Sequence, residues 1–350
     1  MSYFHILEEK QIMRHLLLVC CFLPVLLFCS CAKIAAKKSD KELLFQRYPE
    51  LYHIREPDVI DQKADRLIAD LLKFKSETEL DFLLIHAYAA KAFAADLRNE
   101  KTDSEKYLHT ALKLLPKIRN TLFYVKSASD VYYMFYWVNR ENIDKAEYWL
   151  AELESLIRNE INSYNYKFGS SEYKRFVQSK FLENTVTRSE FLLVYKKNLP
   201  AAERVLLCGM KKACEWPDYP SFVSTLYSYD LASEIYYRKK DEAACCRYVE
   251  KWLLLAMKLN RLPTYSRFHF YNIQMKNGHY RPALDYCLKI LDMDFLKSSE
   301  MNGIRKIFLE RASEAAYKLK DFKTAEKYAA QAEKLSLPPE NGNKSSSKLK

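Results

Sequence analysis

The sequence contains very little glycine. Only five of its 350 residues are glycine, against an average usage of about 7%. No G-x-G-x-x-G or G-x-x-x-x-G-K pattern occurs, so a glycine phosphate loop is excluded. β-Hairpin turns commonly need glycine, and none of the Asn-Gly pairs has alternating strand-like runs on both sides. The scarcity of glycine therefore predicts a mostly helical chain.

Known catalytic and metal-binding motifs are also lacking. His53, His86, His109, His269 and His279 form no H-E-x-x-H or other metal spacing, and no G-x-S-x-G occurs. We interpret His86, within FLLIHAYAA, as a histidine of the core or a helix flank whose hydrogen bonds are satisfied, rather than as a metal ligand. The sequence thus predicts no catalytic residue, no metal and no cofactor. We expect a protein that is not an enzyme, with a scattered catalytic site as the alternative.

Cysteine is distributed unevenly along the chain. The first 31 residues hold four cysteines, and the body holds Cys208, Cys214, Cys245, Cys246 and Cys287. This odd number in a long chain does not indicate a disulfide framework, and the body has no C-x-x-C pair for zinc. We interpret the body cysteines as small buried hydrophobes in helices.

The N-terminal region contains the one long apolar run. The uncharged residues 16–32 follow the basic stretch Met13-Arg14-His15 and include Pro24. A transmembrane helix needs about 20 apolar residues, so the run is at the lower limit. The order of basic, apolar and small residues is typical of a secretory signal. Met13 is a plausible true start of translation.

The end of the run resembles the lipobox of bacterial lipoproteins. In the stretch FCSC, Ser30 precedes Cys31, while Phe28 and Cys29 depart from the strict family pattern. The resemblance implies that Cys31 is acylated and anchors the chain to a membrane. A plain cleaved signal and an uncleaved anchor are the alternatives. The basic stretch AKIAAKK follows, and by the same resemblance it implies a periplasm-facing protein of the cell envelope.

The net charge of +11 suits an anionic membrane surface or acidic partners. Binding of nucleic acid is the other interpretation of a basic chain, and it conflicts with export. We therefore expect no nucleic-acid partner.

The body divides into helical segments. Apolar residues recur at helical spacing, and prolines fall at or beside the expected boundaries, where they cost little. A capping box from Thr102 to Glu105 is expected to begin the third helix. We predict helices over residues 58–75, 78–98, 102–116, 119–139, 142–165, 171–197, 199–214, 219–238, 241–259, 264–277, 279–293, 299–318 and 321–336.

The last helix pair, RASEAAYKLKDFKTAEKYAAQAEKLSLPP, resembles a tetratricopeptide repeat. Ala312 and Ala316 occupy packing positions of the first helix, and Phe322 and Ala325 occupy the turn and the second helix. Earlier copies place small anchor residues 42, 56, 42, 39 and 42 residues apart, longer than the family's 34. These anchors are Ser104, Ala146, Ala202, Ala244, Ala283 and Ala325.

The resemblance implies an all-α fold, an α-solenoid of antiparallel helix hairpins stacked like a tetratricopeptide superhelix. The expected organisation is a signal peptide with a lipobox-like end over 1–31, a linker over 32–56, the solenoid over 57–337 and a disordered tail over 338–350.

The 26 tyrosines are the remaining feature. We interpret them first as side chains that fill the gaps between long helices. In this repeat class, however, the first helix of each hairpin lines the concave face, where tyrosine offers flat area and a hydroxyl. Counting from the anchors places Asn184 and Thr187 among the groove-facing slots, with Tyr227 one position off its slot. The count gives a candidate partner-binding groove. Its residues are Asn139, Tyr195, Tyr229, Tyr236, Tyr237, Tyr265, Asn272, Lys276 and Lys318.

Such a groove suits an extended peptide or a glycan. The sequence therefore predicts a lipid-anchored, non-enzymatic scaffold that binds a protein or peptide partner at the cell envelope. The alternative is a glycan-binding lipoprotein of a nutrient-uptake system.

Overall fold

The computed structural model describes residues 44, 51, 56–74, 77–121, 123–219, 222–261 and 267–335. The chain divides into two units, 1–49 and 50–350, and all helices discussed here belong to the second. The described residues contain helices and turns but no strand, which confirms the all-α class. The expected signal peptide, Cys31, Tyr265, the disordered tail and nearly all of the linker lie outside the described residues.

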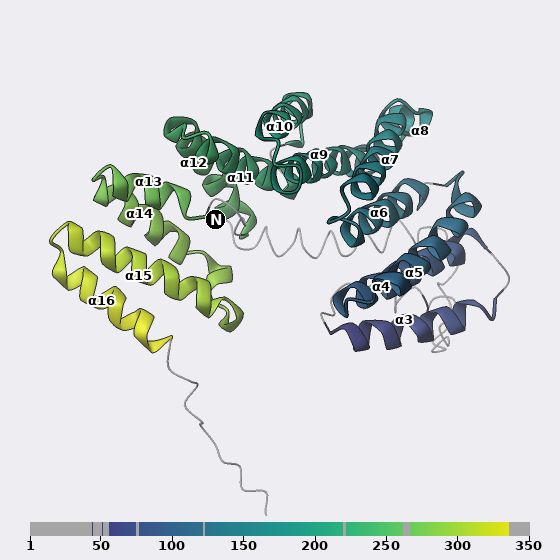
Figure 1. Cartoon of the computed structure of the whole chain (residues 1–350), viewed down its shortest axis with the longest axis horizontal. Coiled ribbons are helices and arrows are strands. Elements are labelled where there is room, and N and C mark those ends of the chain that lie inside the picture. Colours follow the sequence, from purple (N-terminus) through teal and green to yellow (C-terminus); the bar gives the residue numbers. More distant parts are fainter. Residues whose placement is uncertain are drawn as a thin grey trace, which may run out of the picture. The chain divides into compact units, whose positions relative to one another are not determined.

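The helices form consecutive antiparallel hairpins after the leading helix α3 (Pro57–Leu71) (Figure 1). A short helix α8 (Tyr164–Phe168) and the 3₁₀ segments η2 (Leu115–Ile118), η4 (Asp294–Lys297) and η5 (Ser299–Met301) lie between hairpins. The pairs are α4 (Thr78–Leu97) with α5 (Lys101–Leu114), α6 (Phe123–Val138) with α7 (Ile143–Ile161), α9 (Ser171–Val194) with α10 (Leu199–Ala213), α11 (Val223–Arg238) with α12 (Glu242–Leu259), α13 (His269–Lys276) with α14 (Tyr280–Leu291), and α15 (Asn302–Lys318) with α16 (Phe322–Lys334).

The predicted anchors lie in the seams between paired helices. Every anchor is buried, with exposed fractions from 0% at Ser104 to 6% at Ala325. Hydroxyl groups bridge several seams: Ser189 Oγ donates to the Ala202 carbonyl and Ser313 Oγ to the Ala325 carbonyl, both at 2.8 Å. Small side chains let the two helices approach closely, which leaves the larger apolar flanks for the neighbouring hairpins.

Most hairpin turns share one backbone conformation. A residue with positive φ lies two positions before the second helix of these hairpins. The next residue is the N-cap of that helix. In three of these turns its side chain accepts a backbone N–H, as where the Asp241 carboxylate accepts the Ala244 N–H at 2.9 Å. The positive-φ turn residues are Asn99, Lys197, Lys240, Gly278 and Lys320.

Two local predictions are wrong. The expected capping box fails because the turn at Asn99 makes α5 begin one residue before Thr102, with no side-chain cap. The cysteines of the body are free thiols, but Cys208 and Cys214 are exposed rather than buried. Position 208 lies about 200° around α10 from the buried Leu206, so it faces away from the seam.

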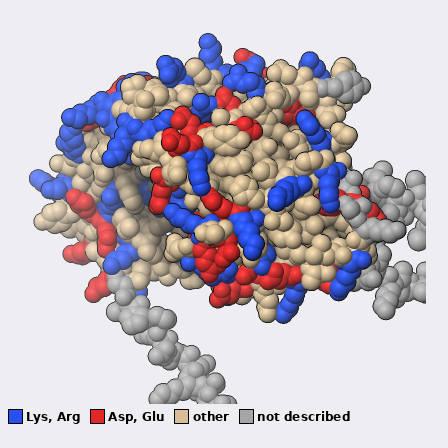
Figure 2. Space-filling view, turned by 45° about the vertical axis from the view of Figure 1, so that its right-hand side comes forward, with Lys and Arg blue, Asp and Glu red and all other residues tan. Residues whose placement is uncertain are grey.

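Each hairpin packs against the next one along the chain, for example α4 against α6, α7 against α9 and α9 against α11. Ion pairs link neighbouring hairpins at their edges, such as Lys145–Glu105 at 2.8 Å and Lys276–Glu242 at 2.6 Å. Figure 2 shows both signs of charge interspersed over one face. Exposed pairs contribute at most about 1 kcal/mol each, so burial of the apolar flanks is the main source of stability.

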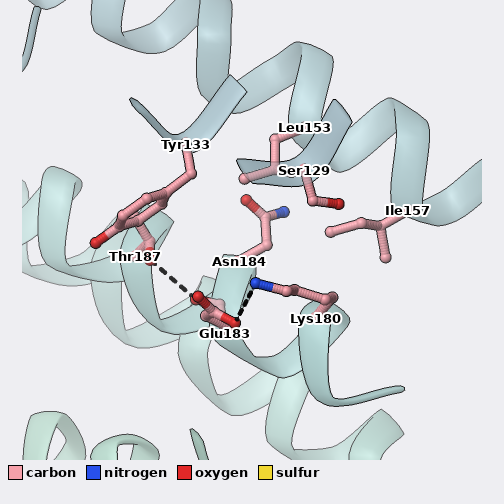
Figure 3. A pocket seen from close by; sticks show the side chains of 8 residues that line it. All are labelled: Ser129, Tyr133, Leu153, Ile157, Lys180, Glu183, Asn184 and Thr187. Atoms are coloured by element: carbon pink, nitrogen blue, oxygen red, sulfur yellow. Dashed lines mark hydrogen bonds and ion pairs between the residues drawn. The ribbon is translucent and has the colours of Figure 1, made fainter. Parts of the chain in front are cut away.

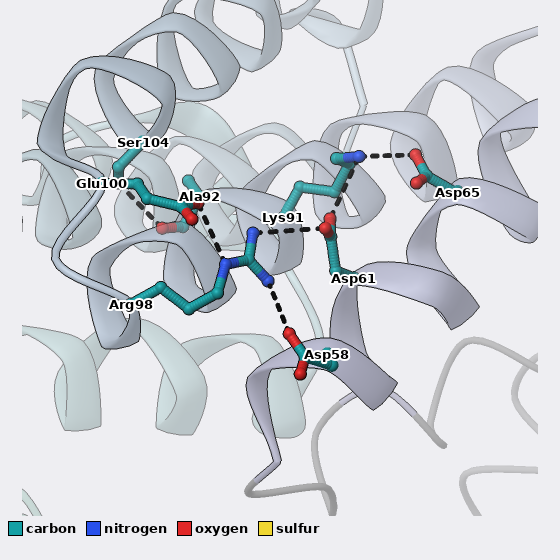
Figure 4. A network of polar contacts seen from close by, with 8 residues as sticks. All are labelled: Asp58, Asp61, Asp65, Lys91, Ala92, Arg98, Glu100 and Ser104. Carbon is teal, nitrogen blue, oxygen red and sulfur yellow. Dashed lines mark hydrogen bonds and ion pairs between the residues drawn. The ribbon is translucent and has the colours of Figure 1, made fainter.

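A polar network joins α3 to α4 (Figure 4). The Lys91 side chain, only 8% exposed, donates to Asp65 at 2.5 Å and pairs with Asp61 at 3.0 Å. Burial alone would lower the pKa of the Lys91 ammonium, but these carboxylates raise it above its usual value. Arg98 adds contacts to Asp61 at 3.2 Å and Asp58 at 3.4 Å. The leading helix is thus held by charge pairing as well as by its apolar face.

Candidate functional site

A large cavity lies where the first helices of three consecutive hairpins meet. It has a volume of about 510 Å³ and is formed by α6, α9 and α11. We call it the α6–α9–α11 cavity. Its lining residues are Tyr133, Ser179, Glu183, Val186, Thr187, Glu190, Val223, Ser224, Tyr227 and Asp230.

Helix periodicity explains why these residues meet. The α9 positions 179, 183, 186, 187 and 190 recur at the three- and four-residue spacing of one helix face. The α11 positions 223, 224, 227 and 230 do the same. The two faces meet because α9 packs against α11, and α6 contributes Tyr133 at the edge of the cavity.

A smaller pocket of about 10 Å³ continues the site between α6, α7 and α9 (Figure 3). It shares Tyr133, Glu183 and Thr187 with the α6–α9–α11 cavity. Asn184 and Ser129 point into this pocket from α9 and α6, 7% and 2% exposed. Asn184 Oδ1 and Ser129 Oγ have no hydrogen-bond partner. The pocket therefore presents two buried oxygen acceptors.

Both signs of charge occur at the site. The lining of the α6–α9–α11 cavity includes three carboxylates and no lysine or arginine. Lys180 lines the smaller pocket, and its Nζ lies 3.1 Å from Glu183 and 3.4 Å from Asp130. Burial, helped by the charges of Glu183 and Glu190, raises the pKa of Tyr133 to about 12. The Tyr133 hydroxyl therefore lies within the field of both carboxylates.

The predicted groove tyrosines of α11 lie elsewhere. Tyr236 stacks on Tyr248 of α12, with ring centroids 5.5 Å apart, and Tyr229 meets the same ring at 6.3 Å. Both are half-buried between helices. Tyr237 is 40% exposed and stacks on His269 of α13 at 3.9 Å.

Asn139 and Tyr195 lie at the C-terminal ends of α6 and α9. Asn139 is 8% exposed and donates to the Phe135 carbonyl at 3.0 Å. Tyr195 is half-buried and stacks on Phe191, with centroids 5.9 Å apart. Each of the two therefore contacts its own helix.

The remaining predicted residues are exposed and follow α13 and α15. Asn272 accepts a hydrogen bond from Arg311 at 3.2 Å, Lys276 pairs with Glu242, and Lys318 lies at the end of α15. Of these nine residues, none within the described ranges lines the α6–α9–α11 cavity, whereas Thr187, also counted to a groove-facing slot, does. Their role in binding a partner stays a prediction.

The structure also brings together three residues whose proximity the sequence did not reveal. Ser127 Oγ lies 3.2 Å from His86 Nε2, and His86 Nδ1 lies 3.9 Å from Asp130 Oδ2. This is the atom order of a serine–histidine–aspartate triad. Ser127 and His86 are, however, 0% and 1% exposed, so no substrate can reach the hydroxyl. Burial lowers the pKa of His86 to about 4, and the neutral ring joins α4 to α6.

Across the described ranges, no group of three or more His, Cys, Asp or Glu side chains is placed to hold a metal ion. Nor does this part of the chain contain a helix with the length and apolar character needed to span a membrane.

Comparison with known proteins gives structural similarities only. No protein-family model and no curated protein matches the chain. One similar structure is BtubC (BKLC) from P. vanneervenii, with TM-score 0.44 and 12% identity over 90% of this chain and 99% of BtubC. Another is a Signal Transduction ATPase with Numerous Domains protein with a tetratricopeptide repeat sensor from Pyrococcus horikoshii. That match has TM-score 0.49 and 14% identity, and it covers 87% of this chain and 47% of the other.

Proposed function

We propose that the chain is a non-enzymatic binding scaffold, attached to the cell envelope by a lipid on Cys31 and facing the periplasm. It holds a protein or peptide partner in the α6–α9–α11 cavity. The observation that carries the proposal is the convergence of three first helices on a cavity of about 510 Å³ with two tyrosines in its wall. This volume lies within the range of about 300–1,000 Å³ that is typical of ligand pockets.

The lipid anchor is supported by the leader sequence around Cys31. A diacylglycerol thioether supplies two acyl chains, which is enough for stable membrane attachment. Labelled palmitate should be incorporated by the wild type and by the matched variant Cys29→Ala, but not by Cys31→Ala. Equal labelling of Cys31→Ala and wild type would refute the anchor.

The partner is tested by cross-linking and affinity capture from solubilised envelope. The full chain and the variant Tyr317→Ala, which truncates a tyrosine 61% exposed on α15, should recover the same partner. Tyr227→Ala, in the cavity wall, should lose it. A partner retained equally by all three proteins would exclude this cavity as the binding site. An empty capture together with a positive glycan array would favour the glycan-binding lipoprotein instead.

A further inference from the structure

We propose that the outward sides of α10 and α12 bind an anionic phospholipid surface. The inference goes beyond the partner cavity, and it rests on the proposed attachment of the chain to a membrane through Cys31. The overall charge of +11 suits such a surface. The residues concerned, which we call the α10–α12 basic face, are Arg204, Cys208 and Lys211 of α10 and Arg247, Lys251, Leu254 and Lys258 of α12.

Helix periodicity gathers these residues on one side of each helix. Successive members are three or four positions apart along α10 and along α12, and every one of them is exposed. The buried residues Leu206 and Val249 lie on the opposite sides of the two helices. Tyr248 of α12 packs against the apolar cluster that contains Leu206 and Met210 of α10. The two outward sides therefore belong to neighbouring helices.

The first argument is positive charge that the protein itself leaves uncompensated. None of the five basic side chains of the α10–α12 basic face forms an ion pair with a described residue. The neighbouring Lys212 differs, because it pairs with Glu215 at 2.6 Å. Lys251 Nζ lies 5.3 Å from the centroid of the Tyr248 ring, a contact that adds no opposite charge. The face therefore presents its cations to solvent.

The carboxylates of α10 and α12 do not cancel this charge. Glu203 pairs with Lys239 at 2.8 Å and Glu242 pairs with Lys276 at 2.6 Å, so both are compensated by lysines from outside the face. Glu250 is the exposed carboxylate of the two helices. Five cations against this one carboxylate leave an excess of positive charge, which attracts anionic lipid headgroups.

The outward side of α14, the next second helix, carries a different pattern. There Arg281 pairs with Asp285 at 3.1 Å, and the exposed Lys289 is followed by the exposed Asp292. Both signs of charge are thus present on α14. The excess of positive charge belongs to α10 and α12 rather than to every second helix.

The second argument is the apolar part of the same surface. Leu254 is 72% exposed between Lys251 and Lys258 in the stripe, and Met257 beside it is 47% exposed. Basic residues combined with exposed leucine are typical of helices that lie at a membrane interface. Lysine stems cover apolar surface while their ammonium groups reach polar groups. A phospholipid surface offers both phosphates and acyl carbon, so it matches both parts of the face.

The third argument is the separation of this face from the partner cavity. The α6–α9–α11 cavity and the smaller pocket are lined by residues of α6, α7, α9 and α11, and neither includes a residue of the basic face. Lipid binding at α10 and α12 therefore leaves the lining of the cavity to a partner.

The test measures how fast individual lysines react on the full-length chain reconstituted in vesicles. The vesicles contain phosphatidylcholine alone or an equimolar mixture with phosphatidylglycerol. A membrane-impermeant reagent acetylates accessible lysines, and mass spectrometry gives the rate at each position. We expect Lys211, Lys251 and Lys258 to react at least about fivefold more slowly on the anionic vesicles, and high salt should remove this protection. Lys106 and Lys113, exposed on α5, should react equally on both.

The protein variants separate this face from general surface charge. Arg247→Gln/Lys258→Gln should reduce the protection of the two remaining lysines of the face to less than about twofold. The matched control Lys323→Gln/Lys334→Gln removes the same charge from exposed positions of α16 and should keep the wild-type protection. Circular dichroism verifies that both are folded. The comparison of the two vesicle types in the wild type tests the lipid requirement independently of any variant.

Three results would overturn the inference. The lysines could be protected equally on both vesicle types, or the two double variants could lose equal protection. Alternatively, a polyglutamate peptide added to phosphatidylcholine vesicles could protect the same lysines as strongly as phosphatidylglycerol does, which would identify an acidic protein as the occupant. If palmitate labels Cys31 and Tyr227→Ala loses a captured partner while these lysines react alike on both vesicles, the proposed function stands and only the membrane-binding face is refuted.

Discussion

Acidification should destabilise the protein through one buried histidine. His86 is 1% exposed, its ring meets Phe82 at 4.6 Å, and burial lowers its pKa from 6.5 to about 4. Between these two pH values the unfolded chain binds a proton that the folded chain does not. Stability is therefore complete above about pH 6.5 and is lost as the pH falls towards 4. At about 1.4 kcal/mol per pH unit, the loss is about 2 kcal/mol at pH 5 and about 3 kcal/mol below pH 4.

Urea denaturation at pH 8, 6 and 5, followed by circular dichroism, measures this loss. Glu234 contributes in the same direction only at lower pH. Burial tends to raise the pKa of Glu234, but its bonds to His269 and Arg238 lower it overall, so its contribution is lost as the pH falls below about 4.5. The comparison with His86→Gln isolates the histidine, because this variant should lose about 2 kcal/mol less than the wild type between pH 8 and pH 5. The control His109→Gln changes an exposed histidine and should keep the wild-type loss. Equal losses in all three proteins would refute the reasoning.

Two further predictions concern the close approach of α9 to Gly209 of α10 and the positive-φ hairpin turns. Gly209→Ala should lower the free energy of unfolding by about 1–2 kcal/mol, because its Cβ would lie 2.2 Å from Thr185 Cγ2 and 2.7 Å from Thr185 Oγ1, and the overpacking exceeds the gain in helix propensity. Thr185→Ala, which removes both clashing atoms, should restore most of the loss, and a more stable Gly209→Ala would contradict this. Lys240→Gly should raise the free energy of unfolding by about 0.5–1 kcal/mol and Gly278→Ala should lower it by about 1 kcal/mol, since both turns require positive φ. Thermal unfolding measures both variants. Shifts of the same sign would be inconsistent with the shared turn conformation.

The helices were predictable because their determinants are local. Pro200, for example, lies in the first turn of α10, where its missing N–H costs nothing. The anchors were also correct in all but one hairpin, since the small seam residue lies four positions after the N-cap of the second helix. After the N-cap Asp241 that position is Cys245, 0% exposed, and the predicted Ala244 lies one residue before it. The start of α5 was wrong because the conformation of Asn99, two residues before the helix, overrides the capping preference of Thr102.

The cavity was predictable only in part, at Thr187 of α9, because the rest depends on how each helix is rotated about its own axis. Tyr227 and Tyr229 are two residues apart, or about 200° around α11. Only Tyr227 lines the cavity, whereas Tyr229 packs against Tyr219 and Tyr248. Counting from the anchors favoured Tyr229. The spacing of Glu183, Thr187 and Glu190 along one face of α9 is the sequence feature that marks this surface.

The position of the cavity has a consequence for how this chain can be divided. Helix pairs add stability one at a time, so many truncated versions of the array are expected to fold. The cavity draws its wall from three successive pairs, α6/α7, α9/α10 and α11/α12. The smallest fragment able to recognise the ligand must therefore span about residues 123–259, and duplication of any single pair would lengthen the protein without creating a second site.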